Sequence, residues 1–196
     1  MTADTGTRSD AVTRLLHAAL ATAVVIELLL QAVMRVPPGV GLGVDDWHRE
    51  AFELHAHFGP TLTVVCALYW TWICLPVSRP GVARLFPWRD RAGRAELKCE
   101  SVDVLKRRLP LHHSADALAR TVQGLGLLAV TAGVLGGTLS YLGYYTRVPV
   151  PAAVLHWASV ELVISSGLVW TFVIGHASMA VLHRIATRLQ AARIPA

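Results

Sequence analysis

At 196 residues, with 54% hydrophobic residues, a mean hydropathy of +0.47 and only 16% charged residues, the chain has too little polar surface for a soluble globule of its size. We therefore expect an integral membrane protein. The formal net charge of +5 does not indicate nucleic-acid binding, because the basic residues are distributed over loops and are not gathered on one surface.

Four stretches are long and apolar enough to cross a membrane, since a spanning helix needs about 20 apolar residues. In chain order they are about 12–34, 53–75, 121–144 and 152–182. The sequence thus predicts an all-α fold, an integral membrane four-helix bundle that forms a single domain over 1–196. The first stretch exceeds the apolar part of a usual signal peptide, so we expect it to be retained as a span.

The connector between spans two and three, at about 78–119, is rich in arginine and holds a candidate helix over 94–109. Fifteen of the 18 Lys and Arg residues lie in the N-terminal segment, in this connector with Arg120, or in the C-terminal tail. By the positive-inside rule, both termini and the connector are expected in the cytoplasm. The basic helix is expected to touch anionic lipid headgroups, with docking of a partner subunit as the alternative.

Span three carries Gly126, Gly133 and Gly137 on one helix face. Small residues on one face allow close helix packing, and a bulky planar ligand needs the same missing side chains. Both interpretations are compatible with the sequence.

The nine histidines differ in what they indicate. Strongly polar residues inside a span are costly and point to function, whereas His48, His112 and His113 fall outside the apolar stretches and are expected at the surface. His17 and His176 lie near the same end of spans one and four, because these helices run in opposite directions. Two neutral imidazoles at one depth are the axial ligands that a low-spin b-type haem requires.

His55 and His57 stand near the start of span two. They differ by about 200° of rotation around a helix, so only one of them can face the interior of the bundle. His55 shares a face with Gly59, and a histidine with glycine one turn below it leaves room for a porphyrin. His55 is therefore preferred to His57, which stays an alternative.

Three segments together resemble the four-helix bacterial cytochrome b561 family, which includes the b-type cytochrome subunits of nickel-iron hydrogenases and formate dehydrogenases. They are TRLLHAAL with His17, HAHFG from His55 to Gly59, and HASMAVLHR from His176 onward. The resemblance covers nearly the whole chain. It implies one or two b haems, bound without a covalent link, with His17 and His176 holding the cytoplasmic haem and His55 supplying one ligand of the outer haem.

The chain departs from the family pattern in span four. The family has an earlier histidine fourteen residues before the late one, and that position is Leu162 here. The other candidate is His156, twenty residues before His176 and on the opposite face of a straight helix. A bend or an altered helix start after Pro149 and Pro151 would bring His156 to the outer haem, and a single-haem protein is the alternative.

Three further polar residues are candidates for supporting roles. His183 lies about 10 Å beyond His176 along the helix, where it is expected at the interface or against a haem propionate or a quinone. Apart from Glu53 at the very start of span two, Glu27 and Glu161 are the only acids within the spans. A carboxylate in lipid is paired or neutralised, and both residues are candidate proton relays for quinone chemistry.

We therefore expect a multi-pass protein of the bacterial inner membrane that carries electrons between the quinone pool and a redox protein or dehydrogenase subunit. The resemblance allows quinone reduction or superoxide oxidation on the chain itself, and a homo-oligomer stays open. Two other classes of protein remain as alternatives. One is a non-redox membrane anchor or assembly subunit, and the other is a small metal-ion transporter with an outer site of His55, His57 and His156.

Overall fold

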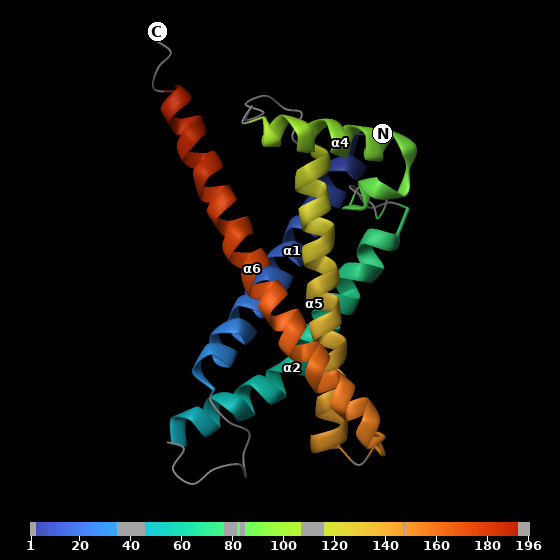
Figure 1. Cartoon of the computed structure of the whole chain (residues 1–196), viewed down its shortest axis with the longest axis vertical. Coiled ribbons are helices and arrows are strands. Elements are labelled where there is room, and N and C mark those ends of the chain that lie inside the picture. The colour runs from blue at the N-terminus through green and yellow to red at the C-terminus, as the bar shows by residue number, and fades with distance from the viewer. Residues whose placement is uncertain are drawn as a thin grey trace.

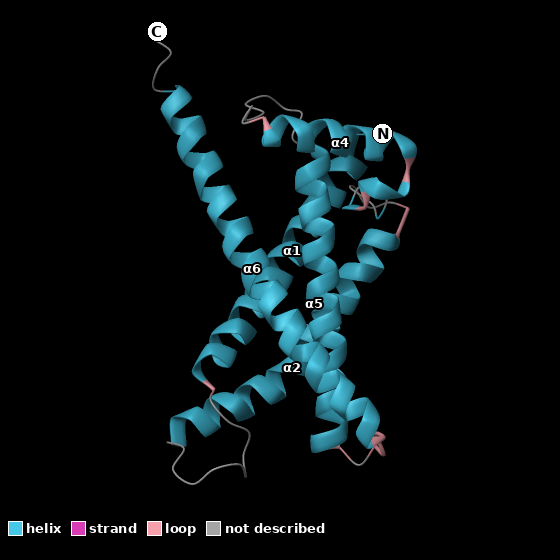
Figure 2. Cartoon of the chain, in the orientation of Figure 1, coloured by secondary structure: helices cyan, strands magenta, loops and turns pink. Residues whose placement is uncertain are grey.

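Helices make up the whole of the regular structure in the computed structural model, which describes residues 3–34, 46–76, 82, 85–106, 116–146 and 148–191. The elements, in chain order, are α1 (Ala3–Val33), α2 (Asp46–Cys74), the 3-10 helix η1 (Pro87–Arg89), α4 (Arg91–Leu105), α5 (Asp116–Tyr145) and α6 (Ala152–Ala191). These ranges contain no strand (Figure 2). The expected all-α class is confirmed.

Three of the four long helices contain a stretch that is long and apolar enough to cross a membrane. These stretches are Ala11–Val33, Ala117–Tyr145 and Ala152–Val181. The stretch 53–75, which the sequence also suggested as a span, lies in α2 and is not among them. Polar and aromatic residues explain the difference, because two histidines near its start and the segment YWTW near its end lower its hydropathy.

The four long helices pack as two pairs that share a central contact. Helix α1 packs against α2, α5 packs against α6, and α2 joins the pairs by packing against α5. The two pairs cross, so that α1 and α6 form an X (Figure 1). Their shared core contains buried side chains from α1, α2, α5, α6 and the segment before η1: Leu20, Val24, Leu28, Cys66, Tyr69, Ile73, Leu85, Phe86, Leu127, Val130 and Val169.

Hydroxyl side chains link α2 to α5 inside this apolar core. Trp70 Nε1 donates to Thr131 Oγ1 at 2.8 Å, and the hydroxyls of Thr63 and Thr138 lie 2.9 Å apart. Each threonine hydroxyl also has a backbone carbonyl four residues earlier within hydrogen-bond distance. These hydroxyl and indole groups of α2 and α5 therefore have partners within the protein, as a membrane interior requires.

Large apolar side chains cover the outside of the helices. Leu68 is 53% exposed, Leu135 is 61% exposed and Val163 is 76% exposed. Such a surface would be unfavourable in water, where it would drive association, but lipid tails cover it in a bilayer. The described residues thus have the surface of a membrane-embedded protein.

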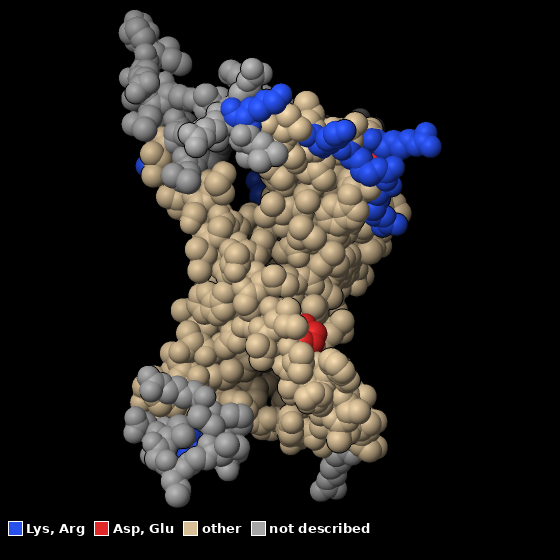
Figure 3. Space-filling view, in the orientation of Figure 1, with Lys and Arg blue, Asp and Glu red and all other residues tan. Residues whose placement is uncertain are grey.

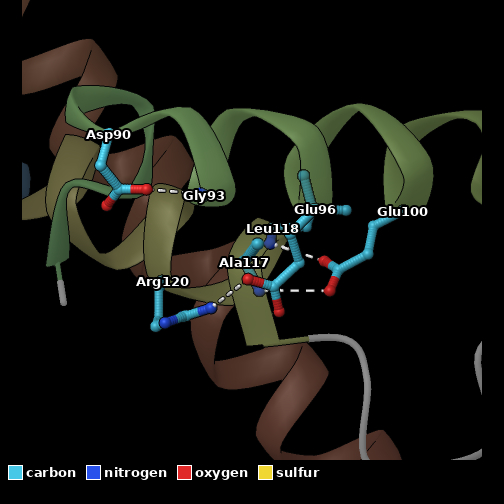
Figure 4. A network of polar contacts seen from close by, with 7 residues as sticks. All are labelled: Asp90, Gly93, Glu96, Glu100, Ala117, Leu118 and Arg120. Atoms are coloured by element: carbon cyan, nitrogen blue, oxygen red, sulfur yellow. Dashed lines mark hydrogen bonds and ion pairs between the residues drawn. The ribbon is translucent and has the colours of Figure 1, made fainter.

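Helix α4 lies across one end of the bundle and is fastened to the first turn of α5 (Figure 4). The buried carboxylate of Glu100 accepts hydrogen bonds from the backbone N–H groups of Ala117, at 3.3 Å, and Leu118, at 2.8 Å. Arg120 forms an ion pair with Glu96 at 2.9 Å. Glu100 therefore caps α5 from another helix, which satisfies two N–H groups that the helix itself leaves free.

Basic side chains gather at the same end of the molecule as α4, while the middle is almost free of charge (Figure 3). Arg89, Arg91, Arg94, Lys98 and Lys106 are all exposed there. The start of α1 and the end of α6 lie at this end as well (Figure 1). We refer to it as the basic end of the bundle.

Candidate functional site

The side chains of His17 and His176 meet toward the basic end of the bundle. His17 comes from α1 and His176 from α6, and their ring centroids lie 6.4 Å apart with 71° between the ring planes. His17 is exposed and His176 is half-buried. The structure therefore brings together two imidazoles that are far apart in the chain, at the matched depth that the sequence predicts.

The spacing of these rings fits a metal held between them. An iron atom with one ring nitrogen about 2 Å away on each side separates the two centroids by about 6 Å. Two rings on a shared axis can adopt any twist about that axis, so the 71° between their planes is compatible with such a site. The donor set also fits, because two neutral imidazoles are haem ligands.

Helices α1 and α6 are held in this register by further contacts. Gln31 Nε2, in α1, donates to Ser166 Oγ, in α6, at 2.6 Å. Near the other end of α1, Trp72 Nε1 donates to the hydroxyl of Thr13 at 2.9 Å, one turn before His17. These bonds fix α1 against both α6 and α2, and nothing in the sequence pattern pointed to them.

Phe172 positions the ring of His176. It stands one turn earlier in α6, and its ring stacks on the imidazole with centroids 5.3 Å apart and 24° between the planes. A Cβ atom at Gly126, in α5, would collide with the Phe172 ring. Gly126 is therefore small because Phe172 needs the space, and the i, i+4 spacing of Phe172 and His176 was the signal that sequence reasoning missed.

The three glycines that share a face of α5 have different surroundings. Gly126 faces Phe172, and a Cβ at Gly133 would lie 3.1 Å from Ser165 Oγ, so both allow α6 to approach closely. A Cβ at Gly137 would meet nothing within 4 Å. Close packing of α5 and α6 thus explains two of the three glycines, and Gly137 borders open space.

His55 lies toward the other end of the bundle and contacts a carboxylate. Its Nδ1 atom touches Oε2 of Glu27, which α1 places in the interior. His55 is half-buried and Glu27 is buried. Gly59 lies beside them, since a Cβ there would be 3.8 Å from Oε1 of Glu27.

His57 points to a different set of side chains. It is exposed, and its ring makes edge contacts with two tyrosines. The ring centroid of His57 lies 6.2 Å from that of Tyr141 and 5.4 Å from that of Tyr145. The Tyr145 hydroxyl donates to Glu53 at 3.3 Å. His55 and His57 therefore face apart, as their spacing on a helix requires.

His156 is exposed near the start of α6, and its ring contacts the neighbouring Trp157. The N–H groups of Val154 and Leu155 donate to the carbonyl of Pro151 at 2.9 and 3.1 Å, so the helix begins with a regular turn. It then continues without interruption to Ala191. The bend that would turn His156 toward the interior does not appear, and the structure does not bring His55 and His156 together.

One expectation about a histidine is wrong, and the expectations about three others concern parts of the chain that the structure does not describe. His48 is 7% exposed, and its Nδ1 atom lies 2.8 Å from the carbonyl oxygen of Val33. The expected surface position of His48 is therefore wrong, because the imidazole satisfies a carbonyl at the end of α1. His112 and His113 lie outside the described residues, as does the side chain of His183. Helix α6 carries His183 beyond its apolar stretch, which ends at Val181.

Another carboxylate with buried oxygens lies between α5 and α6. Both oxygens of Glu161 are buried without a hydrogen-bond partner among the described residues, and one of them rests where a Cβ of Gly136 would be. Glu161 lines a pocket of about 340 Å³ together with residues such as Ala132 and Ser165. The rest of the lining is almost wholly apolar, and Trp157 on its rim is 68% exposed.

No metal-binding cluster of the kind that a metal-ion transporter needs is formed by the described side chains. Within the described ranges, no group of three or more His, Cys, Asp or Glu residues is placed to hold a metal ion. The three cysteines, all of which are described, are free. The outer site of His55, His57 and His156 is therefore not assembled in this structure.

Comparison with protein families gives a match to the model for prokaryotic cytochrome b561, over residues 8–194. This range includes α2, α5 and α6, all of α1 except its first five residues, and each of the histidines discussed above. No curated protein and no solved structure matches the chain significantly.

Proposed function

The chain belongs to the prokaryotic cytochrome b561 family, and from this premise we propose that His17 and His176 would together hold the iron of one haem b. Membership of the family makes the protein a membrane b-type cytochrome in electron transfer. The observation that carries the assignment of the ligands is the 6.4 Å separation of the two rings between α1 and α6. A bound haem supplies an iron that takes up and releases one electron.

The two imidazoles determine what kind of haem site this is. A haem held by both His17 and His176 would leave no ligand position for oxygen and would be suited to carrying electrons. Phe172 holds the His176 ring from one side, and the bonds that fix α1 hold His17. Rigid ligands keep the iron site unchanged between its two oxidation states, which favours rapid electron transfer.

We propose a second haem b with His55 as one ligand and His156 as its partner on α6. His55 supports this proposal by its half-buried position beside Gly59. Because His156 is exposed on a regular helix, its ring has to turn inward or the start of α6 has to move before both can bind one iron. The haem content of the purified chain decides between one haem and two.

The membrane orientation follows from the charges. The exposed basic residues around α4 gather at the end of the bundle that also holds the start of α1 and the end of α6. By the positive-inside rule this end faces the cytoplasm of a bacterium, and the protein is a multi-pass protein of the inner membrane with both termini inside. His17 and His176 are then the cytoplasmic pair.

A membrane-soluble quinone is the proposed electron carrier on one side of the reaction, and a redox protein or dehydrogenase subunit is the partner on the other. The pocket beside Glu161 supports the quinone, because its volume of about 340 Å³ falls within the usual range for ligand pockets. Its lining is apolar and includes the exposed side chain of Trp157, and Glu161 offers a carboxylate that can exchange a proton with a quinol hydroxyl.

The absorption spectrum of the purified chain, oxidised and then reduced with dithionite, tests this function. We expect the sharp α-band of a b-type haem on reduction, and a pyridine haemochrome assay gives the number of haems per chain. Absence of this α-band would support a non-redox anchor subunit instead. His17→Ala and His176→Ala should each lose the same haem, whereas His57→Ala, which removes an exposed imidazole, should lose none. Full haem content in either of the first two variants contradicts the pairing.

A further inference from the structure

A buried carboxylate meets His55 within the helix bundle. Oε2 of Glu27, in α1, contacts Nδ1 of His55, in α2. Glu27 is 7% exposed, and apart from this contact neither of its carboxylate oxygens has a hydrogen-bond partner among the residues that the structure describes. The imidazole of His55 is thus the polar group that the structure provides for this carboxylate.

Placing a glutamate within an apolar membrane segment costs free energy that packing does not offset. Glu27 lies inside the apolar stretch Ala11–Val33 of α1, and carboxylates in such segments are paired or serve a function. An apolar residue would fill the same space against α2 without a buried charge. The contact with His55 therefore indicates that Glu27 acts on the imidazole.

The contact also distinguishes the two nitrogens of His55. Nδ1 faces the carboxylate, so Nε2 is the nitrogen that remains for a metal. A metal-binding histidine commonly donates its other N–H to a carboxylate, which fixes the tautomer and the orientation of the ring. We propose that Glu27 is the positioning residue for His55 and holds its Nδ1–H so that Nε2 binds haem iron.

This inference rests on the proposed function, in which His55 is a haem ligand. It adds that α1 serves both haem sites. His17 is a ligand of one iron, and Glu27, ten residues or about 15 Å further along the same helix, orients a ligand of the other. A negative charge hydrogen-bonded to an imidazole makes the ring a stronger donor, which stabilises ferric iron and lowers the reduction potential of that haem.

Two replacements of Glu27 separate its hydrogen bond from its charge. Glu27→Gln keeps an oxygen that can accept the Nδ1–H bond but removes the charge. Its haem content should equal that of the parent, and the potential of the haem that depends on His55 should rise. Glu27→Leu removes both, so the affinity for that haem should fall by about 10- to 100-fold. The remaining low-spin electron paramagnetic resonance signal should broaden, because the ring is no longer fixed.

The full-length purified chain is used for all measurements, which are haem per chain, a potentiometric titration and the resonance spectrum of the ferric protein. Glu100→Gln is the matched control. It makes the same change at another buried acid, which accepts hydrogen bonds from backbone N–H groups of α5 and does not contact an imidazole. We expect the control to leave both the potential and the spectrum of the His55-dependent haem unchanged.

The outcomes separate this inference from the function on which it rests. If His55→Ala keeps every haem of the parent, His55 is not a ligand, and both the second haem site and the inference fail. If His55→Ala loses a haem while both Glu27 variants match the parent, only the inference is overturned. An equal rise of potential in Glu100→Gln also overturns it, because any buried charge would then have the same effect.

Discussion

Replacing Gly126 by alanine should weaken haem binding through Phe172, although residue 126 is not a ligand. A Cβ atom at this position collides with the Phe172 ring, and that ring stacks on His176 with centroids 5.3 Å apart. The colliding atoms belong to the outer part of a flexible side chain, so the ring moves and α5 and α6 need not separate. The movement changes the position of the His176 imidazole.

The size of the effect follows from overpacking. An added methyl group in a packed interior costs about 1–3 kcal/mol. If that strain falls on the ring that holds His176, haem affinity drops by about 5- to 140-fold, since about 1.4 kcal/mol corresponds to a factor of ten. Haem titration of the purified apoprotein, followed by absorbance, measures this affinity directly.

A double-mutant cycle shows whether Phe172 carries the effect. Phe172→Leu removes the ring that collides, so Gly126→Ala should cost little in that background. Gly137→Ala is the matched control, because a Cβ there meets nothing within 4 Å. An equal loss of affinity from Gly126→Ala with and without the ring would refute the reasoning, as would an equal loss in Gly137→Ala.

Three further predictions concern the second haem and the connector. Gly59→Ala should leave the folded protein as stable as its parent, because the new methyl makes only an ordinary contact at 3.8 Å. It should still lower the haem content, since it fills space one turn below a ligand, whereas Gly137→Ala should retain all haem. His156→Ala should reduce the haem content from two per chain to one; an unchanged ratio in the haemochrome assay would remove His156 as a ligand. Glu100→Ala should destabilise the protein by about 0.5–2 kcal/mol through loss of the cap on α5, measured as a lower Tm, while Glu96→Ala, which breaks an exposed ion pair, should cost less than about 1 kcal/mol.

The proximity of the His17 and His176 rings could be predicted because it depends on quantities that a sequence contains. The apolar stretches fix the depth of each residue, and antiparallel helices bring residues of equal depth to one level. The rotation between His55 and His57 follows from helix geometry in the same way. Each of these expectations requires only the geometry of one helix, or of two helices whose directions across the membrane are known.

Contacts that depend on which helices are neighbours could not be predicted. His48 was expected at the surface because it lies outside an apolar stretch, but the start of α2 packs beside the end of α1 and buries it. Glu27 was identified as an unusual acid, and only the packing of α1 on α2 shows that His55 is its partner. The role of Gly126 needed the position of Phe172 on another helix.

Exchange of each proposed ligand for methionine tests most directly whether His17 and His176 bind one iron. Methionine–histidine ligation raises the reduction potential of a haem above that of bis-histidine ligation. In a potentiometric titration of the purified chain, His17→Met and His176→Met should each raise the potential of the same haem and leave any other haem unchanged. If the two variants raise the potentials of different haems, or if neither variant changes the potential of any haem, His17 and His176 do not share an iron.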